Sequence, residues 1–203
     1  MKVVIIGNGM VGYKFCERLV SRSGPGQFNI VVFAEETRPA YDRVHLSEYF
    51  AGKTADDLSL AHTGWYHSNH IKLHLADPVV QIHRAGNILR TFSAMVESYD
   101  FLVLATGSSA FVPNIDGIEK EGVFIYRTIE DLEMISSWAR KAKTGAVIGG
   151  GLLGLEAAKA LLDLGITNPH VIEFAPRLMP RQVDDAGSSC LQSKLQSLGL
   201  HIH

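Results

Sequence analysis

The chain has 203 residues, of which 46% are hydrophobic and 20% are charged, and its formal net charge is −2. This is the composition of a globular protein, and the charge excludes the broad positive field that binds nucleic acid or an anionic membrane. No apolar run approaches the roughly 18–20 residues that span a bilayer, and two cysteines without a CxxC pair exclude a disulfide scaffold. We therefore expect a cytoplasmic protein with no nucleic-acid or membrane partner.

The opening residues have the pattern of a β-α-β unit. Residues 2–6 are a β-branched run typical of a buried strand, an amphipathic helix follows and ends at residues 23–26, and residues 29–34 predict a second strand. The glycines of the fingerprint Gly7-x-Gly9-x-x-Gly12 stand between the first strand and the helix. In such a turn the first glycine allows the bend, the second lets a pyrophosphate approach the backbone, and the third lets helix and strand pack closely. The pattern predicts a dinucleotide site.

The same unit predicts which further residues meet the dinucleotide. The pyrophosphate would lie at the helix N-terminus, where Met10 begins the helix. An acidic residue at the end of the second strand would accept hydrogen bonds from ribose hydroxyls. Glu35 and Glu36 both stand there, and the spacing does not choose between them.

The middle of the chain predicts shorter elements. Residues 38–61 are polar and irregular, with short helices, and residues 111–122 form a junction rich in glycine, proline and polar residues. We expect helices at 63–69 and 129–143, a hairpin turn at 85–87, and strands at 71–75, 79–83, 88–92, 101–105 and 123–126.

The opening pattern then recurs 142 residues later. A strand at 145–148 leads into Gly149-x-Gly151-x-x-Gly154, followed by a helix at 155–164 and a strand at 170–174. Leu152 and Leu153 stand inside this glycine turn, as Met10 stands inside the first, and we expect them among the cofactor-binding residues. A further helix at 185–198 and the opening of a strand at 200–203 follow.

Two acidic residues accompany this second fingerprint. Glu173 ends the strand, where a carboxylate accepts from a 2′-hydroxyl and repels a 2′-phosphate, which favours NAD over NADP. Arg177 is close enough in sequence to weaken that preference. Glu156 lies in the first helical turn, and the sequence leaves open whether it is a ligand or simply an acid favoured by the helix dipole.

Together these elements predict an α/β fold with two Rossmann-like dinucleotide-binding units, the second truncated. We expect an FAD-binding domain at 1–112 with a small β-meander insertion, a connector at 113–143, and an NAD(H)-binding domain at 144–203 that is incomplete at its C-terminus. Two dinucleotide sites in series suit a protein that passes electrons between cofactors, most commonly FAD and NADH.

Several runs resemble the N-terminal region of the large subunit of bacterial NAD(P)H-dependent nitrite reductases, within the pyridine nucleotide–disulfide oxidoreductase superfamily. Beside the two fingerprints, they are Tyr-Asp-Arg-Val-His-Leu-Ser at 41–47, Ala-Thr-Gly at 105–107 and Arg-Thr-Ile-Glu-Asp at 127–131. The resemblance implies a flavoprotein that takes hydride from NADH onto FAD and, in a longer parent protein of nitrate assimilation, reduces nitrite to ammonium. It also implies siroheme and iron–sulfur clusters downstream, and further redox domains or a small subunit as partners.

The resemblance also assigns residues. It places Arg43 and Ser47 beside the FAD pyrophosphate and flavin, Ala105, Thr106 and Gly107 in a strand-end turn packed against FAD, and Arg127 near the flavin. Related ferredoxin and rubredoxin reductases carry a lysine directly after the Leu-Ser pair, where this chain has Glu48.

Other functions remain as alternatives. They are a stand-alone rubredoxin- or ferredoxin-type NADH reductase, an FAD- and NADH-binding module without turnover, and an inactive fragment. We expect no catalytic acid–base side chain. We also expect no metal site, because no carboxylate or cysteine at suitable spacing completes a ligand set with the histidines at 62, 67, 70 and 74.

Overall fold

A computed structural model describes residues 1–23 and 26–203. The chain divides into two compact units, one formed by residues 1–43 and 55–109 and the other by residues 44–54 and 110–203. Each unit is described by itself. Of the turn expected to end the first helix, residues 24 and 25 lie outside the described residues. The expected domain limits of 1–112, 113–143 and 144–203 stay a prediction.

The first unit is built on a four-stranded parallel sheet. Its strands are β1 (Lys2–Ile6), β2 (Asn29–Phe33), β3 (Ile71–His74) and β7 (Phe101–Leu104), in the order β3-β2-β1-β7. Strands β1 and β2 are apolar on both faces because the sheet is covered on both sides, as parallel sheets usually are.

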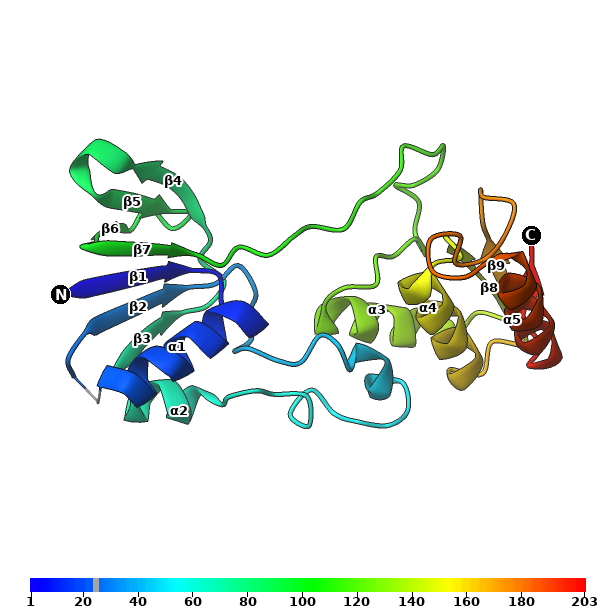
Figure 1. Ribbon diagram of the computed structural model, residues 1–203, viewed down its shortest axis with the longest axis horizontal. Coiled ribbons are helices and arrows are strands. Elements are labelled where there is room, and N and C mark those ends of the chain that lie inside the picture. Colours follow the sequence, from blue (N-terminus) through cyan, green and yellow to red (C-terminus); the bar gives the residue numbers. More distant parts are fainter. Residues whose placement is uncertain (24–25) are drawn as a thin grey trace. The chain divides into compact units, whose positions relative to one another are not determined.

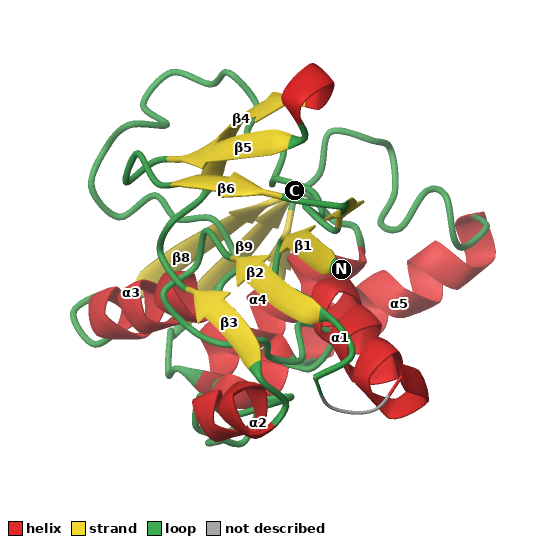
Figure 2. Cartoon of the chain, turned by 90° about the vertical axis from the view of Figure 1, so that its left-hand side faces the viewer, coloured by secondary structure: helices red, strands yellow, loops and turns green. Residues whose placement is uncertain are grey.

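Helices cover one face of this sheet and a second, smaller sheet covers the other (Figures 1 and 2). The helices are α1 (Met10–Ser23) and α2 (Thr63–Ser68), whose Cys16 and Tyr66 pack against Val3 and Ile5. The small sheet consists of β4 (Val79–His83), β5 (Ile88–Thr91) and β6 (Val96–Ser98), which are antiparallel. The 3-10 helix η2 (Arg84–Gly86) joins β4 to β5.

The second unit repeats the β-α-β pattern. Its parallel strands are β8 (Thr144–Ile148), β9 (Asn168–Ile172) and β10 (His201–Ile202), in the order β10-β9-β8. Its helices are α3 (Ile129–Ala139), α4 (Leu152–Asp163), α5 (Asp185–Ser197) and the 3-10 helix η1 (Leu46–Tyr49). Leu155, Ala158, Val171 and Leu200 form much of its core.

Most expected elements are present, and the α/β class with parallel sheets is confirmed. The prediction of a strand at 123–126 is wrong, because these residues are irregular. Strand β6 is present although the sequence pattern did not predict it. Helix α3 ends at Ala139, four residues before the expected end.

The two units differ on one face of their sheets. Ile6 and Phe33 of the first unit are buried beneath the small antiparallel sheet, with Leu89 of β5 packed against them. Ile148 and Ile172 hold the equivalent positions in the second unit, where 59% and 45% of their surface is exposed. Among the described helices, none is long and apolar enough to cross a bilayer.

Candidate dinucleotide-binding sites

In the first glycine turn, a Cβ would collide with the backbone at Gly7 and Gly12 but not at Gly9. Gly7 has φ +103° and donates its N–H to the carbonyl of Phe33 at 2.8 Å. A Cβ on Gly7 would lie 2.2 Å from the carbonyl oxygen of Ala105, and a Cβ on Gly12 would lie 2.0 Å from that of Gly7. A Cβ on Gly9 would meet nothing within 4 Å. This is the division of roles expected for a turn that packs tightly and receives a pyrophosphate at its second glycine.

The second glycine turn resembles the first except that a Cβ on its first glycine, Gly149, would meet nothing within 4 Å. Gly149 has φ +111° and donates its N–H to the carbonyl of Ile172 at 2.8 Å, and a Cβ on Gly154 would lie 1.9 Å from the carbonyl oxygen of Gly149. A Cβ on Gly151 would again meet nothing within 4 Å. Both turns therefore leave open space where the second glycine exposes its backbone.

The start of helix α4 has no side-chain cap. Its N-cap is Gly151, which makes no side-chain hydrogen bond to the first turn. Helices α3 and α5 instead begin with capping side chains, Thr128 and Asp184. Uncapped N–H groups at a helix start, reinforced by the helix dipole, are a suitable place for a phosphate. Leu152 and Leu153, expected beside the ligand, are exposed there, whereas Met10 at the start of α1 is half-buried.

A buried hydrogen bond supports the first turn. The hydroxyl of Tyr66 in α2 donates to Oδ1 of Asn8 at 3.0 Å. Burial raises the pKa of Tyr66 to about 12, so the phenol stays a donor across the physiological range. Asn8 Nδ2 is buried and has no hydrogen-bond partner among the described residues. Neither residue was predicted, because no local pattern connects positions 58 apart.

The acid at the end of β2 is part of a small network. Glu36 Oε2 accepts from the hydroxyl of Tyr41 at 2.6 Å, and Glu36 Oε1 forms an ion pair with Arg43. The guanidinium of Arg43 also lies 4.8 Å from the ring centre of Tyr41, in range for a cation–π contact. Glu35 is exposed instead. The structure thus orients Glu36 and brings Arg43 to it.

The turn at 105–107 lies against the first fingerprint. Ala105 donates its N–H to the carbonyl of Ile6 at 2.8 Å, which continues β7 beside β1. The carbonyl of Ala105 and the N–H of Thr106 are the atoms that a Cβ on Gly7 would strike. Gly107 follows with φ +69°, a conformation that glycine adopts without strain.

The acid at the end of β9 is tied directly to the second turn. Glu173 Oε2 accepts from the N–H of Gly150 at 2.6 Å, and Oε1 accepts from the N–H of Ala175 at 2.7 Å. Charge-assisted hydrogen bonds of this kind are stronger than neutral ones, and they fix the carboxylate beside the turn.

Ser47 and Glu156 belong to the second unit together with Tyr126. The ring of Tyr126 stacks on Phe50 at 6.1 Å and 24°. Burial, and after it the negative charge of Glu156, raise the pKa of Tyr126 to about 12, and its buried hydroxyl has no hydrogen-bond partner among the described residues. Tyr126 was not predicted as a site residue. Arg43 and Ser47, both expected beside the FAD, belong to different units.

The backbone of Arg127 is held at the start of α3. The N–H groups of Arg127 and Thr128 donate to Asp131 Oδ2 at 3.1 and 2.8 Å, and Asp131 donates its own N–H to the hydroxyl of Thr128. This capping box fixes where the Arg127 side chain leaves the chain.

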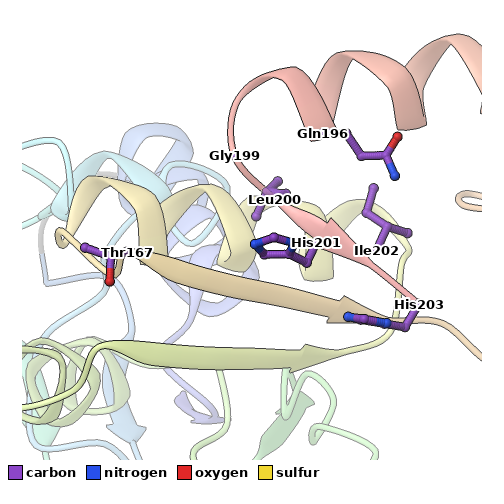
Figure 3. A pocket seen from close by; sticks show the side chains of 7 residues that line it. All are labelled: Thr167, Gln196, Gly199, Leu200, His201, Ile202 and His203. Atoms are coloured by element: carbon purple, nitrogen blue, oxygen red, sulfur yellow. The ribbon is translucent and has the colours of Figure 1, made fainter.

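A pocket of about 460 Å³ lies elsewhere in the second unit (Figure 3). It is lined by Thr167, Gln196 and residues 199–203, none of which belongs to a glycine turn. His170 Nδ1 and His203 Nε2 are 2.9 Å apart beside it. Within residues 1–23 and 26–203, no group of three or more histidine, cysteine or acidic residues is arranged to hold a metal ion. The pocket therefore adds nothing to the dinucleotide sites.

Comparison with known proteins places this geometry in a family. The sequence profile of the pyridine nucleotide-disulphide oxidoreductases matches residues 1–203. The chain is 48% identical over 203 residues to the nitrite reductase (NADH) large subunit of Escherichia coli, covering all of this chain and 24% of that protein. It is 38% identical to the assimilatory nitrate reductase electron transfer subunit of Bacillus subtilis, covering 98% of this chain and 26% of that protein.

A solved structure agrees with these relatives. A ferredoxin reductase from Rhodopseudomonas palustris superimposes with a TM-score of 0.90 at 29% identity, covering all of this chain and 50% of that one. The chain spans about a quarter of the length of the two curated relatives above.

Proposed function

The chain belongs to the pyridine nucleotide-disulphide oxidoreductase family, and we propose that it is the part of a flavoprotein oxidoreductase that binds FAD at the first glycine turn and NADH at the second. The observation that carries this proposal is the repeated turn: Gly9 and Gly151 face open space, whereas Gly12 and Gly154 are closed by backbone contact. Backbone contact accounts for glycine at positions 12 and 154, and a bound dinucleotide is the proposed reason for glycine at positions 9 and 151, where no protein atom would meet a Cβ.

The residues of the chain would act by binding and orientation. The backbone at Gly9 and Met10 would hold the FAD pyrophosphate, and Glu36 with Arg43 would meet the ribose and pyrophosphate. The backbone at Gly151, Leu152 and Leu153 would hold that of NADH, with Glu173 on the ribose. When bound, the flavin would accept two electrons from NADH as hydride and pass them on. Proximity and orientation supply most of the acceleration of such a transfer, and no acid–base side chain is needed.

Residues near the flavin are proposed on the same basis. Ala105, Thr106 and Gly107 would wall the FAD site, and Arg127, Ser47 and Glu156 would lie toward the reacting rings. Glu156 is near enough to Tyr126 for its charge to raise the pKa of that phenol, which supports grouping Glu156 with Tyr126 and with Ser47 of the same unit.

We propose that the electrons leave for nitrite in the longer protein. The 48% identity to a nitrite reductase large subunit over the whole chain supports this acceptor. Cys16 is buried in the first unit and Cys190 is exposed in the second, so a dithiol relay within the chain is not available. Siroheme and iron–sulfur clusters outside these 203 residues, or a small subunit, would receive the electrons. The free cysteines suit the reducing cytoplasm, where we place the protein.

Anaerobic reduction tests the proposal. FAD is added to this chain and to the longest protein that its gene encodes, unbound flavin is removed, and NADH is mixed in without oxygen. We expect retained yellow colour that bleaches, weakened FAD retention in Gly9→Ala, and normal retention in Gly64→Ala, another glycine open to solvent. Absence of FAD retention in both proteins would refute the proposed function.

A ferredoxin- or rubredoxin-type reductase is the second candidate. The fit to a ferredoxin reductase structure at 29% identity favours it. Supplying the reduced protein with nitrite, ferredoxin and rubredoxin separates the two, because only the true acceptor should reoxidise the flavin at a useful rate.

A further inference from the structure

The loop after β9 folds back onto the second glycine turn. The N–H of Met179 donates to the carbonyl of Gly150 at 3.0 Å. The side chain of Leu178 is buried and lies where a Cβ on Gly150 would meet it at 2.5 Å. Together with the hydrogen bond from Ala175 to Glu173, these contacts fix the loop at both ends. Arg177, one residue before Leu178, is thus held in the neighbourhood of the turn.

The guanidinium of Arg177 is directed toward the start of α5. Its Nη1 donates to Asp185 Oδ1 at 2.7 Å, and its Nη2 donates to the carbonyl of Pro180 at 3.3 Å. Its Nε is buried and has no hydrogen-bond partner among the described residues. The Nε–H of Arg177 is therefore an unused hydrogen-bond donor, although both Nη atoms of its guanidinium already donate hydrogen bonds.

Asp185 is not needed to begin the helix. The N-cap of α5 is Asp184, whose Oδ1 accepts the N–H of Gly187 at 2.8 Å. Asp185 is the first helical residue, and its side chain is 89% exposed while it contacts Arg177. The carboxylate can therefore be changed without removing the cap.

We propose that Asp185 is a specificity-determining residue of the second dinucleotide site, which selects NADH over NADPH by holding Arg177. The 2′ position of the adenosine ribose lies beside the acid at the end of the second strand, and an arginine near that acid is the group that accepts a 2′-phosphate. Here that arginine is already paired with a carboxylate. Asp185 thereby supplements Glu173, which is fixed to Gly150. This inference rests on the proposed NADH site.

The test replaces Asp185 with asparagine in the FAD-loaded protein. Calorimetry measures the binding of 2′,5′-ADP, which carries the 2′-phosphate, and of 5′-AMP, which lacks it. Because the Asp185–Arg177 pair is exposed and exposed pairs are weak, we expect D185N to bind 2′,5′-ADP about three- to tenfold more tightly, with 5′-AMP binding unchanged. The ratio of flavin reduction rates, NADPH over NADH, should rise by a similar factor.

Two further variants distinguish the effect of releasing Arg177 from the effect of removing one negative charge. Asp163→Asn breaks the exposed Lys159–Asp163 ion pair of α4 with the same change of charge, and it should leave both ligands unaffected. The double variant D185N/R177Q should lose the gain for 2′,5′-ADP, because the cation that D185N releases is gone.

The outcomes are distinct. Unchanged 2′,5′-ADP binding in D185N, or a gain that persists in D185N/R177Q, would overturn the role of Asp185. Failure of 5′-AMP to bind the unmodified protein would instead overturn the NADH site on which the inference rests.

Discussion

Glu173 and Gly150 are joined by a 2.6 Å hydrogen bond, so the acid that ends β9 is part of the glycine turn that precedes α4. In the first unit the acid Glu36 is oriented differently, by the side chains of Tyr41 and Arg43. The two turns share their backbone geometry, but each fixes its acid by its own contacts.

Removing the charge of Glu173 should weaken both the second site and the fold. Glu173→Gln keeps the shape and removes the charge, and its single amide oxygen can accept only one of the two N–H groups of Gly150 and Ala175. We expect about tenfold weaker NADH binding and a free energy of unfolding lower by about 1–3 kcal/mol, measured by titration and urea denaturation. Glu119→Gln, at an exposed carboxylate, is the control. Equal effects in the two variants would contradict the role of Glu173.

Alanine at Gly12 of the first fingerprint should destabilise the fold, whereas alanine at Gly9 should weaken the binding of FAD. Gly12→Ala places a Cβ 2.0 Å from the carbonyl oxygen of Gly7, and overpacking of this kind costs about 1–3 kcal/mol or more. Gly9→Ala meets no protein atom, so it should weaken FAD binding while the free energy of unfolding stays within about 0.5 kcal/mol. Flavin titration and urea denaturation of both variants measure these effects. A destabilised Gly9→Ala would show that the open space is not kept for a ligand.

Loss of one buried hydroxyl should loosen the first turn. Tyr66→Phe keeps the ring but leaves Asn8 Oδ1 buried without the Tyr66 donor, which costs about 1–3 kcal/mol. Because Asn8 lies between Gly7 and Gly9, FAD retention should fall as well. Tyr13→Phe removes a partly buried hydroxyl that contacts Glu17 and should do neither. Chemical denaturation with flavin release as the second readout decides between them.

The two thiols should differ in reactivity and in their effect on pH stability. Burial raises the pKa of Cys16 to about 12 from an ordinary 9.0, so iodoacetamide near neutral pH should modify exposed Cys190 alone, as peptide mass mapping can check. Above pH 9 the unfolded thiol ionises while the folded one does not. Stability is therefore complete below pH 9 and falls toward pH 12 by up to about 1.4 kcal/mol per pH unit.

The window from pH 9 to 10 isolates Cys16 from Tyr66 and Tyr126, whose ordinary pKa of 10.0 is also raised to about 12. Cys16→Ala should flatten the fall of stability in that window. An unchanged slope would mean that the thiol does not titrate as its burial requires.

The sequence predicts well whatever is encoded by neighbouring residues. The strands β1 and β2, the helices α1 and α4 and both glycine turns follow from β-branched runs, helical periodicity and glycine spacing. The irregular segment at 123–126 misled the prediction because Val, Phe, Ile and Tyr favour strands locally, whereas here no neighbouring strand pairs with them.

Contacts between distant residues were beyond such patterns. Three features depend on how the whole chain folds: the hydrogen bond from Tyr66 to Asn8, the effect of the Glu156 charge on Tyr126, and the grouping of residues 44–54 with the second unit. The contacts of Glu36 with Tyr41 and Arg43 likewise could not be predicted from the local pattern.

Each glycine turn takes its shape from atoms of its own unit, Ala105 and Gly7 in one case and Gly149 with Glu173 in the other. A substitution at one turn therefore removes none of these contacts at the other turn. A duplicated ancestor could in this way diverge into two sites with different ligands, and protein engineers can retune either half alone.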